Sequence, residues 1–353
     1  MKKKILIFRT DRVGDLINTS SFLKSLKFNY QNSEIILVCS KYNSVIAKNY
    51  EFIDKVLIYD KSYNLLKKII FILKFFFLKF DVSIAIDGKN ISYLISIIAN
   101  AKEKYAVCFK KKKYLLGFSY FLYRPSLIMC NLFFHTHIVC NENYFDINSN
   151  KDFKNHYSTM FFYLFKKNNI NLIPQGHIFN LDSKSIEKSN NFFNNFINSK
   201  HLVFHIDSKW DVYNINIDEF NKFLNDISVK FKIIITTGIE DSKFVDQLKS
   251  IYKKYYFNNN NINESNKIES NIFLLDKLDI NLLGAFISKS DLFISSHSGA
   301  PLHIAAAFNI PIIDFIKKEK ELEYNRWIPL NVKYFRANIN NLSDLKKIVL
   351  DLN

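Results

Sequence analysis

The chain has 353 residues, more than one compact domain of ordinary size holds, so its length predicts two domains of roughly 150–200 residues each. Hydrophobic residues make up 48% of the chain and charged residues 23%, which excludes a mainly disordered protein because the apolar surface suffices to offset chain entropy. The formal net charge of +16 favours an anionic partner: a nucleotide, a nucleic acid or a phosphorylated lipid surface.

The four cysteines form no C-x-x-C pair, and the apolar run at residues 5–8 is too short for the core of a signal peptide. We therefore expect the reducing cytoplasm as the compartment. The most apolar stretch, residues 69–80, is interrupted by Lys74 and Lys79, so it contains no run of about 20 uncharged residues that could span a bilayer. We expect no transmembrane helix.

The first half alternates short β-branched runs with longer helical patterns, which is typical of a parallel sheet wrapped by helices. Right-handed crossovers would place these helices on the faces of the sheet. The expected strands are residues 4–9, 34–39, 55–59 and 82–86, and the expected helices are 16–28, 43–49, 63–78 and 91–100. Residues 101–150 contain a lysine run and no clear period, and we expect a mixed structure there.

A second alternation of expected strands and helices begins after Pro174-Gln175-Gly176. Because Pro and Gly interrupt regular structure, this segment is the best domain boundary. Residues 258–271 are an Asn-rich polar loop inside the second alternation. The chain is expected to be α/β, with domains 1–175 and 176–353 and a cleft at the carboxyl ends of their strands. The second domain should contain strands at 201–206, 231–236, 272–275, 291–295 and 311–315, and helices at 217–229, 241–252, 281–288 and 301–308.

Four loops at expected strand ends carry candidate functional residues. The first is the run from Arg9 to Asp15, between the first strand and an apolar helix. Gly14 would allow a tight turn, and Arg12 offers a fork-shaped donor for carboxylate or phosphate. Asp15 has two interpretations: a cap of the helix, or a general base that takes a proton from an attacking hydroxyl.

The second and third loops follow strands of the second domain. Ser208 and Lys209 come directly after strand 201–206. Lys209 is either a solvated loop charge or a contact for a phosphate and for the charge that develops on a leaving group. In the third loop Glu240 follows the turn at Gly238. It is either a favourable charge at a helix N-terminus or a carboxylate that binds a ribose hydroxyl.

The fourth loop, residues 295–299, joins a strand to a helix. It turns at Gly299, and Pro301 is a permitted first-turn residue of the helix. This pattern aims backbone N–H groups at an anion, the hydroxyls of Ser296 and Ser298 add donors, and His303 lies in the first turn. A diphosphate would be satisfied there without a metal. The alternative is a capped helix that binds no ligand.

Other candidates are weaker. The spacing of Cys130, His135, His137 and Cys140 is irregular for zinc, and we predict no metal there. The chain has neither G-x-G-x-x-G nor a P-loop, which weighs against a dinucleotide oxidoreductase and a P-loop NTPase, and it has no nucleic-acid motif. The helix near residues 63–79 could cover the sheet, or lie on a membrane surface through snorkelling lysines.

The four loops together resemble glycosyltransferase family 9, the heptosyltransferases of lipopolysaccharide core assembly. Residues 9–15 are similar to the family's opening R-x-D-x-x-G-D, and Lys209-Trp210 to its K-x-W or K-W element. Residues 236–240 resemble its strand-Gly-Glu turn, and residues 298–307 resemble its D-[ST]-G-x-x-H-x-A-A-A motif. The resemblance extends over nearly the whole chain.

The resemblance implies a GT-B fold, in which two Rossmann-like doubly wound domains face each other across a cleft. The N-terminal domain would bind the acceptor, a lipid-linked phosphorylated saccharide of the lipopolysaccharide or lipooligosaccharide core, and no nucleic acid is expected. The C-terminal domain would bind the nucleotide sugar, ADP-heptose in the family. The transfer would be inverting and would use no metal or other cofactor. Asp15 would be the general base, Arg12 and Gly14 would support the acceptor or the loop, and the donor would contact Ser208, Lys209, Glu240, Ser298, Gly299 and His303.

Two departures from the family pattern fall in the donor loop. His297 stands where the family has Asp before the hydroxyl-Gly pair, and one extra residue separates Gly299 from His303. A base other than adenine, or a sugar other than heptose, therefore stays open. Two further alternatives stay open. The chain could be a non-catalytic protein of the same fold that binds a nucleotide sugar or nucleic acid, and it could contact the inner face of the inner membrane peripherally.

Overall fold

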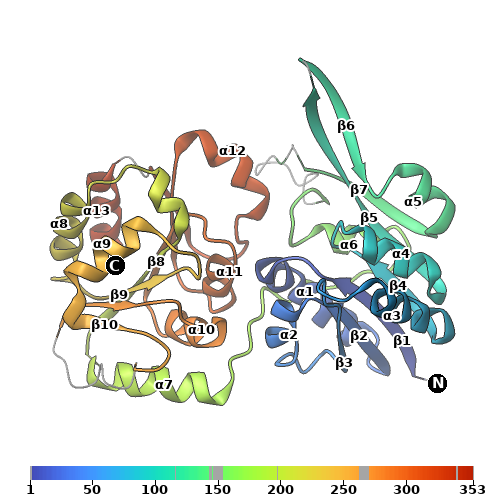
Figure 1. The fold of residues 1–353 in the computed structure, drawn as a ribbon, viewed down its shortest axis with the longest axis horizontal. Helices are drawn as coiled ribbons and strands as arrows, with labels where there is room; N and C mark the ends of the chain where they lie inside the picture. The colour runs from blue at the N-terminus through green and yellow to red at the C-terminus, as the bar shows by residue number, and fades with distance from the viewer. Residues whose placement is uncertain are drawn as a thin grey trace. The chain divides into compact units, whose positions relative to one another are not determined.

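Two largely parallel sheets organise the chain (Figure 1). The computed structural model describes residues 2–115, 117–142, 145, 154–196, 198–261, 270–338 and 341–352. The contacts define two compact units: unit 1 is Met1–Asn180 with Asn325–Ile328, and unit 2 is Leu181–Tyr324 with Pro329–Asn353. The expected boundary after residue 175 lies a few residues before this division, and residues 325–328 return to unit 1.

Unit 1 contains a seven-stranded sheet in the order β3-β2-β1-β4-β5-β6, with β7 beside β5. Its described strand pairs are parallel except β5 with β6, which are antiparallel. The central strand β1 is apolar and buried on both faces because helices cover the sheet. The strands are β1 (Lys3–Arg9), β2 (Ser33–Cys39), β3 (Lys55–Ile58), β4 (Lys79–Ala85), β5 (Asn100–Leu115), β6 (Phe118–Arg124) and β7 (Thr136–Asn141). The helices are α1 (Val13–Asn29), α2 (Lys41–Ala47), α3 (Leu65–Phe77), α4 (Asn90–Ile98), α5 (Leu127–Phe133) and α6 (Met160–Lys166).

The short segment Asn325–Ile328 packs on unit 1. Nε2 of His156 lies 2.9 Å from the carbonyl oxygen of Ile328, and the N–H of Tyr157 donates to the carbonyl of Arg326 at 3.0 Å. The rings of Tyr157 and Trp327 lie 5.8 Å apart. Burial lowers the pKa of His156 to about 3, so this histidine is neutral where it meets the returning segment.

Unit 2 contains a seven-stranded, wholly parallel sheet in the order β10-β11-β9-β8-β12-β13-β14. One face packs on a core rich in phenylalanine around the buried Trp210. The strands are β8 (Lys200–Ile206), β9 (Phe231–Thr237), β10 (Tyr256–Phe257), β11 (Ile272–Leu275), β12 (Leu292–Ser295), β13 (Ile312–Ile316) and β14 (Tyr334–Asn338). The helices are α7 (Ser183–Phe193), α8 (Ile217–Ile227), α9 (Lys243–Ile251), α10 (Ile280–Ser288), α11 (Ala300–Ala307), α12 (Glu321–Tyr324) and α13 (Leu342–Asp351).

The α/β, doubly wound class predicted from the sequence is confirmed in both units. Each strand and helix expected before residue 100 and from 201 to 315 is present, with ends shifted by a few residues. Residues 101–150 contain β5, β6, α5 and β7, which accounts for the mixed pattern. Residues 143–144 and 146–150 of that segment, and 262–269 of the Asn-rich loop, lie outside the described residues.

Candidate active site

In each unit the first strand lies inside the sheet, at the point where the strand order reverses. Strand β1 lies between β2 and β4, and β8 lies between β9 and β12. At such a point the loops after the two central strands run in opposite directions, which leaves room for a ligand at the carboxyl edge. The first, second and fourth loops predicted from the sequence follow β1, β8 and β12. Each is therefore placed at a switch point of its own unit.

Arg9 ends β1, and its guanidinium is fully buried. Its Nε and Nη2 atoms donate to the backbone carbonyl of Asp15 at 3.1 and 2.9 Å, and Nη1 donates to the carbonyl of Ile86 at 3.1 Å. Nη1 also lies 3.4 Å from Oδ2 of Asp11. Although burial opposes it, the carboxylates of Asp11 and Asp15 raise the pKa of Arg9. The hydrogen bonds of Arg9 thus link the start of α1 to the end of β4. Its guanidinium also places a permanent positive charge at the carboxyl edge of the sheet.

Two more carboxylates lie around this guanidinium. Burial raises the pKa of Asp11 well above its usual range, while Arg9 opposes the shift. Asp87 follows β4 and accepts hydrogen bonds from the N–H and hydroxyl of Thr10 at 2.9 and 2.7 Å and from the hydroxyl of Ser92 at 2.7 Å. The carboxylates of Asp11 and Asp87 therefore interact with side chains and backbone of unit 1 itself.

Asp15 differs from these two carboxylates. It is the third residue of α1, and all the hydrogen bonds it makes with other described residues go through its backbone, whose carbonyl also accepts from the Thr19 hydroxyl at 2.7 Å. The side chain is half-buried. Its charge adds to burial in raising the pKa of Tyr157, so the carboxylate lies near that ring. A carboxylate on a fixed backbone with unused oxygens can accept a proton from a ligand.

The other expectations for the first loop need correction. The N-cap of α1 is Arg12, whose side chain makes no capping hydrogen bond, so the helix-cap interpretation of Asp15 is wrong. Gly14 is the second residue of the helix and is buried, so it does not form a tight turn. Arg12 is exposed, and the buried fork-shaped donor of this loop is Arg9.

In unit 2, Asp207 joins the loop after β8 to the loop after β12. Its carboxylate accepts from the N–H of Lys209 at 3.1 Å, from the hydroxyl of Ser298 at 3.0 Å and from the hydroxyl of Ser296 at 3.4 Å. Trp210, which is 1% exposed, donates its indole N–H to the hydroxyl of Ser296 at 3.1 Å. Two loops that are distant in sequence are thereby held in one arrangement.

Lys209 is not a freely solvated loop charge. Its Nζ atom donates to the carbonyl of His297 at 2.9 Å and lies 3.5 Å from Oδ2 of Asp207. The side chain remains 42% exposed, so the ammonium is positioned by the fold and still accessible. A cation held beside the loop that precedes a helix adds to the positive end of the helix dipole.

The loop before α11 has an unusual backbone. His297 and Gly299 have φ values of 55° and 53°, a left-handed conformation that costs free energy for a residue other than glycine. A Cβ atom on Gly299 would meet nothing within 4 Å, so the space beside it is open. The first N–H groups of α11 have no acceptor within the helix, and Pro301 lies in the first turn as expected. Ser298 and His303 are buried at this helix start.

The side chain of His297 faces a buried carboxylate. Its Nδ1 lies 2.6 Å from Oδ2 of Asp314 on β13, and the Tyr334 hydroxyl donates to the same oxygen at 2.5 Å. The imidazole stacks on Tyr324 with ring centres 4.0 Å apart and planes 10° apart. These contacts hold the strained backbone at His297, the position at which the chain departs from the family pattern.

Glu240 lies on the neighbouring loop, after β9. It is exposed and accepts a hydrogen bond from the hydroxyl of Ser208. The next helix, α9, is capped by Ser242, whose hydroxyl accepts from the helix backbone at 3.2 Å, so Glu240 is not the cap. A Cβ atom on Gly238 would lie 3.3 Å from the Cβ of Asp207. The absence of a side chain there lets the two loops approach each other.

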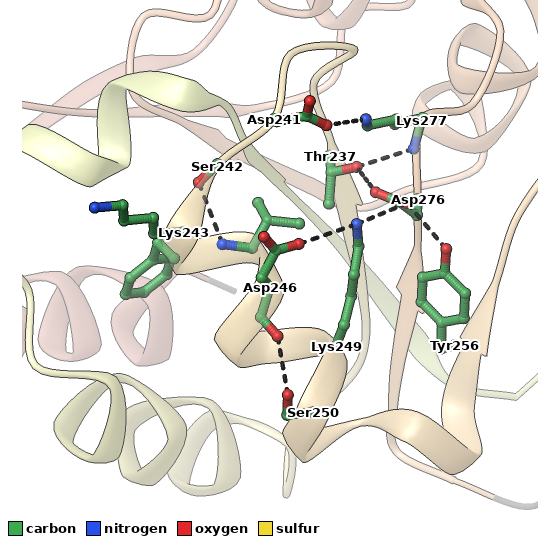
Figure 2. A network of polar contacts seen from close by, with 12 residues as sticks. Thr237, Asp241, Ser242, Lys243, Asp246, Lys249, Ser250, Tyr256, Asp276 and Lys277 are labelled. Carbon is green, nitrogen blue, oxygen red and sulfur yellow. Dashed lines mark hydrogen bonds and ion pairs between the residues drawn. The ribbon is translucent and has the colours of Figure 1, made fainter.

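Figure 2 shows the polar network that supports this loop. The buried Asp276, after β11, accepts from the hydroxyls of Thr237 at 2.6 Å and Tyr256 at 3.0 Å, and lies 3.1 Å from Nζ of Lys249. Lys277 donates its N–H to Thr237 at 2.9 Å. Although burial opposes it, Asp276 raises the pKa of Lys249. The ends of β9 and β11 are thus tied together beneath the turn that carries Glu240.

Each edge therefore has its own chemistry: unit 1 offers a carboxylate free to take a proton, and unit 2 offers cationic and N–H donors suited to an anion. Sequence reasoning missed the residues that hold these groups in place. Asp207 had a signal, because it directly follows an expected strand. Asp314 had none, because it lies inside a strand. Arg9 and Asp11 lie in the first candidate loop, but nothing in their spacing indicates that they bond within the fold, and Asp87 lies outside the four loops.

Comparison with solved structures agrees with this architecture. A glycosyl transferase family 9 protein from Veillonella parvula superposes with a TM-score of 0.70 at 13% identity, covering 100% of this chain and 92% of that chain. The chain has the family 9 fold. Heptosyltransferase WaaC of E. coli with ADP-2-deoxy-2-fluoro heptose superposes with a TM-score of 0.62 at 12% identity, covering 98% of this chain and 97% of that one.

Sequence comparison finds a relative that is also named as a glycosyltransferase. A Haemophilus influenzae protein named "Putative glycosyltransferase" is 20% identical over 338 residues, which cover 93% of this chain and 86% of the relative. No protein-family model matches the chain. At these identities the likeness shows the fold alone, so the roles of individual residues depend on the geometry described above.

Proposed function

We propose that the chain is an inverting glycosyltransferase that needs no metal and uses Asp15 as its general base. The proposed reaction moves heptose from ADP-heptose to a saccharide of the lipopolysaccharide core. The observation that carries the proposal is the anion site of unit 2, where Lys209, Ser298 and the start of α11 are held together by Asp207. The relatives support it, because one is named as a glycosyltransferase and another holds an ADP-heptose analogue.

The donor is expected to bind unit 2 through its diphosphate. The ammonium of Lys209 and the N–H groups at the start of α11 would neutralise the phosphate charge, and the open space beside Gly299 would let the phosphates approach the backbone. Glu240, positioned by Ser208, would accept from a ribose hydroxyl. His303 would line the same helix start.

The acceptor is expected to bind unit 1 and to be a lipid-linked phosphorylated saccharide. Its hydroxyl would give a proton to the Asp15 carboxylate while its oxygen forms a bond to the anomeric carbon. The bond from that carbon to the diphosphate breaks on the opposite face, so the configuration is inverted. The electron pair leaves with the diphosphate, where Lys209 and α11 stabilise the added charge.

The test is a thermal-shift panel of ADP, UDP, GDP, CMP and ADP-heptose. A ligand present at 100 times its Kd adds about 2.7 kcal/mol to the stability of the folded state, which is a shift of several degrees. We expect ADP and ADP-heptose to stabilise the wild type. Lys209→Ala should remove most of the shift, because it deletes the cation at the phosphates. Ser298→Ala should reduce the shift, because it removes the hydroxyl through which Asp207 holds the start of α11.

The matched control is Lys222→Ala, which removes an exposed lysine on α8 of the same unit and should leave the shift unchanged. A larger shift with another nucleotide would contradict the ADP-heptose assignment and retain the transferase. Stabilisation by nucleotides without transfer to any acceptor would favour the non-catalytic binding protein. No shift with any nucleotide would contradict the proposed function.

A further inference from the structure

Helix α3 turns an apolar face to solvent. Its inner side packs on the sheet through Phe71 and Phe75, which confirms that the helix covers the sheet. The outer side is apolar as well, and Phe77 is 76% exposed. A surface helix normally presents polar residues there. The exposed residues recur at helical spacing: Leu66, Ile69, Ile70, Leu73, Phe76 and Phe77.

Two neighbouring elements share this character. The β5–β6 hairpin carries Phe118, which is 80% exposed, and helix α5 carries Leu132, which is 70% exposed. Large exposed apolar side chains gathered on neighbouring elements are typical of an interaction site. The other exposed apolar residues are Tyr114, Leu115, Tyr120 and Phe121 on the hairpin and Ile128, Met129 and Phe133 on α5.

These elements occupy one flank of unit 1, which we call the α3–α5 flank (residues 65–78, 110–115 and 117–133). Helix α3 packs beside α4. Tyr93 of α4 meets Phe134, the residue after α5, edge-on with ring centres 6.1 Å apart. Strand β6 ends at Arg124 and α5 begins at Leu127, so the hairpin continues directly into α5. Figure 1 shows α3, α4 and α5 along the same side of unit 1, with the hairpin projecting above them.

The charge of the flank has one sign. Its residues include eight Lys and Arg and no Asp or Glu, which corresponds to half of the net charge of +16. Lysines beside exposed aromatic and aliphatic side chains can keep their ammonium groups in water while their stems extend over an apolar surface. The flank therefore offers both exposed apolar side chains and cations.

We propose that the α3–α5 flank docks unit 1 on the surface of an anionic membrane. Apolar side chains would enter the boundary between headgroups and acyl chains, and the lysines would meet acidic headgroups. No described helix combines the length and apolar character needed to cross a bilayer. This inference goes beyond the proposed reaction and does not depend on it.

The combination of features favours a membrane over other partners. A nucleic acid would use the cations and leave the exposed Leu, Ile and Phe side chains of α3 and α5 in water. A second copy of this chain would bring two basic surfaces together without acidic partners, which like-charge repulsion opposes. An anionic lipid surface satisfies the cations and the apolar side chains at the same time.

The test is co-sedimentation of the full chain with vesicles of phosphatidylcholine alone and with about 30% phosphatidylglycerol, since each Lys or Arg near an anionic surface strengthens binding about fivefold, or about 1 kcal/mol. We expect strong binding to the anionic vesicles only. The triple variant Lys67→Gln, Lys111→Gln and Lys113→Gln should bind roughly 100-fold more weakly by the same rule. Ile70→Ser with Phe77→Ser should weaken binding by at least about tenfold.

Matched controls come from exposed residues of unit 2. The triple variant Lys222→Gln, Lys289→Gln and Lys347→Gln, and the pair Val229→Ser with Ile251→Ser, should bind vesicles like the wild type. All variants change exposed side chains except at Lys113, which is half-buried. Circular dichroism of each variant reports folding, and its nucleotide-induced thermal shift reports the function of unit 2.

Three results would overturn the inference: no binding to anionic vesicles, equal binding to both vesicle types, or equal losses in the flank and control variants. A dimer in solution that Ile70→Ser with Phe77→Ser converts to a monomer would assign the flank to self-association instead. Loss of nucleotide binding with vesicle binding intact would contradict the proposed function and leave this inference standing.

Discussion

Units 1 and 2 place the same loops at the same point of their sheets and give them opposite chemistry. In unit 1 the permanent cation, Arg9, is fully buried, and the accessible group is the carboxylate of Asp15. In unit 2 the arrangement is reversed: Asp207 is engaged by two loops, and the accessible group is the cation Lys209. One topology thus leaves an accessible carboxylate in one unit and an accessible cation in the other.

The two units differ in which charged side chain forms the hydrogen bonds that link neighbouring elements. Arg9 links the start of α1 to the end of β4, so Asp15 remains available. Asp207 links the loops after β8 and β12, so Lys209 remains available. In both units the charge that bonds within the fold positions the accessible one, and substitutions at the two positions should have separable effects.

The largest expected effect is on the proposed chemical step. Asp15→Asn should lower kcat about 10²- to 10⁴-fold, because an amide cannot accept the acceptor's proton. Binding of ADP should be unchanged, because the proposed donor site lies on unit 2. Transfer is measured by mass spectrometry of the acceptor, and ADP binding by thermal shift. Glu51→Gln, an exposed carboxylate of unit 1, is the control. Equal losses of transfer and ADP binding would contradict the assignment of Asp15 as the base.

The next effect compares the two cations in terms of stability. Arg9→Met should lower the free energy of unfolding of unit 1 by about 3–5 kcal/mol, because it leaves Asp11 as a buried, unpaired carboxyl. Lys209→Met should cost less than about 1 kcal/mol, because its ion pair is solvent-exposed. Both are measured by urea denaturation. Adding Asp11→Asn to Arg9→Met should recover part of the loss. Equal costs at Arg9 and Lys209 would show that the two cations have the same structural role.

The smallest expected effect is a pH dependence that separates the units. Burial lowers the pKa of His205 in unit 2 to about 4, whereas an unfolded histidine titrates near pH 6.5. As the pH falls from about 6.5 to 4, the histidine is protonated in the unfolded state but stays neutral in the folded state. The free energy of unfolding therefore falls by up to about 1.4 kcal/mol per pH unit. His205→Asn should reduce this slope for the unfolding of unit 2 only. An unchanged slope would mean that His205 is protonated in the folded state.

The sequence contained enough information for the repeating architecture and for the position of the functional loops. Periodicity placed the strands that end at Arg9 and Ile206, because buried parallel strands are continuous apolar runs bounded by polar loops. The parallel order then determines that loops after neighbouring strands share one edge. Asp15, Lys209 and Glu240 were found this way, and their catalytic or binding roles stay predictions.

The sequence could not show which charged side chains would form hydrogen bonds and ion pairs within the fold. Gly14 is a residue type typical of a turn, but the helix already begins at Val13. Arg12 could donate to a ligand, but the buried guanidinium of this loop belongs to Arg9. His297 is held by Asp314, which is distant in the chain and lies within a strand. Such pairings depend on tertiary contacts, for which local spacing carries no signal. The exposed face of α3 was equally ambiguous, because its inner and outer sides are both apolar.

The return of Asn325–Ile328 to unit 1 affects how this protein can be divided. A gene cut after residue 180 would encode neither unit completely. The first fragment would lack the segment whose Arg326 and Ile328 carbonyls bond Tyr157 and His156, and the second would retain that segment without its binding surface. A fragment intended to isolate unit 1 needs residues 325–328 joined back by a linker, and only such a fusion gives a fair measure of what each unit does alone.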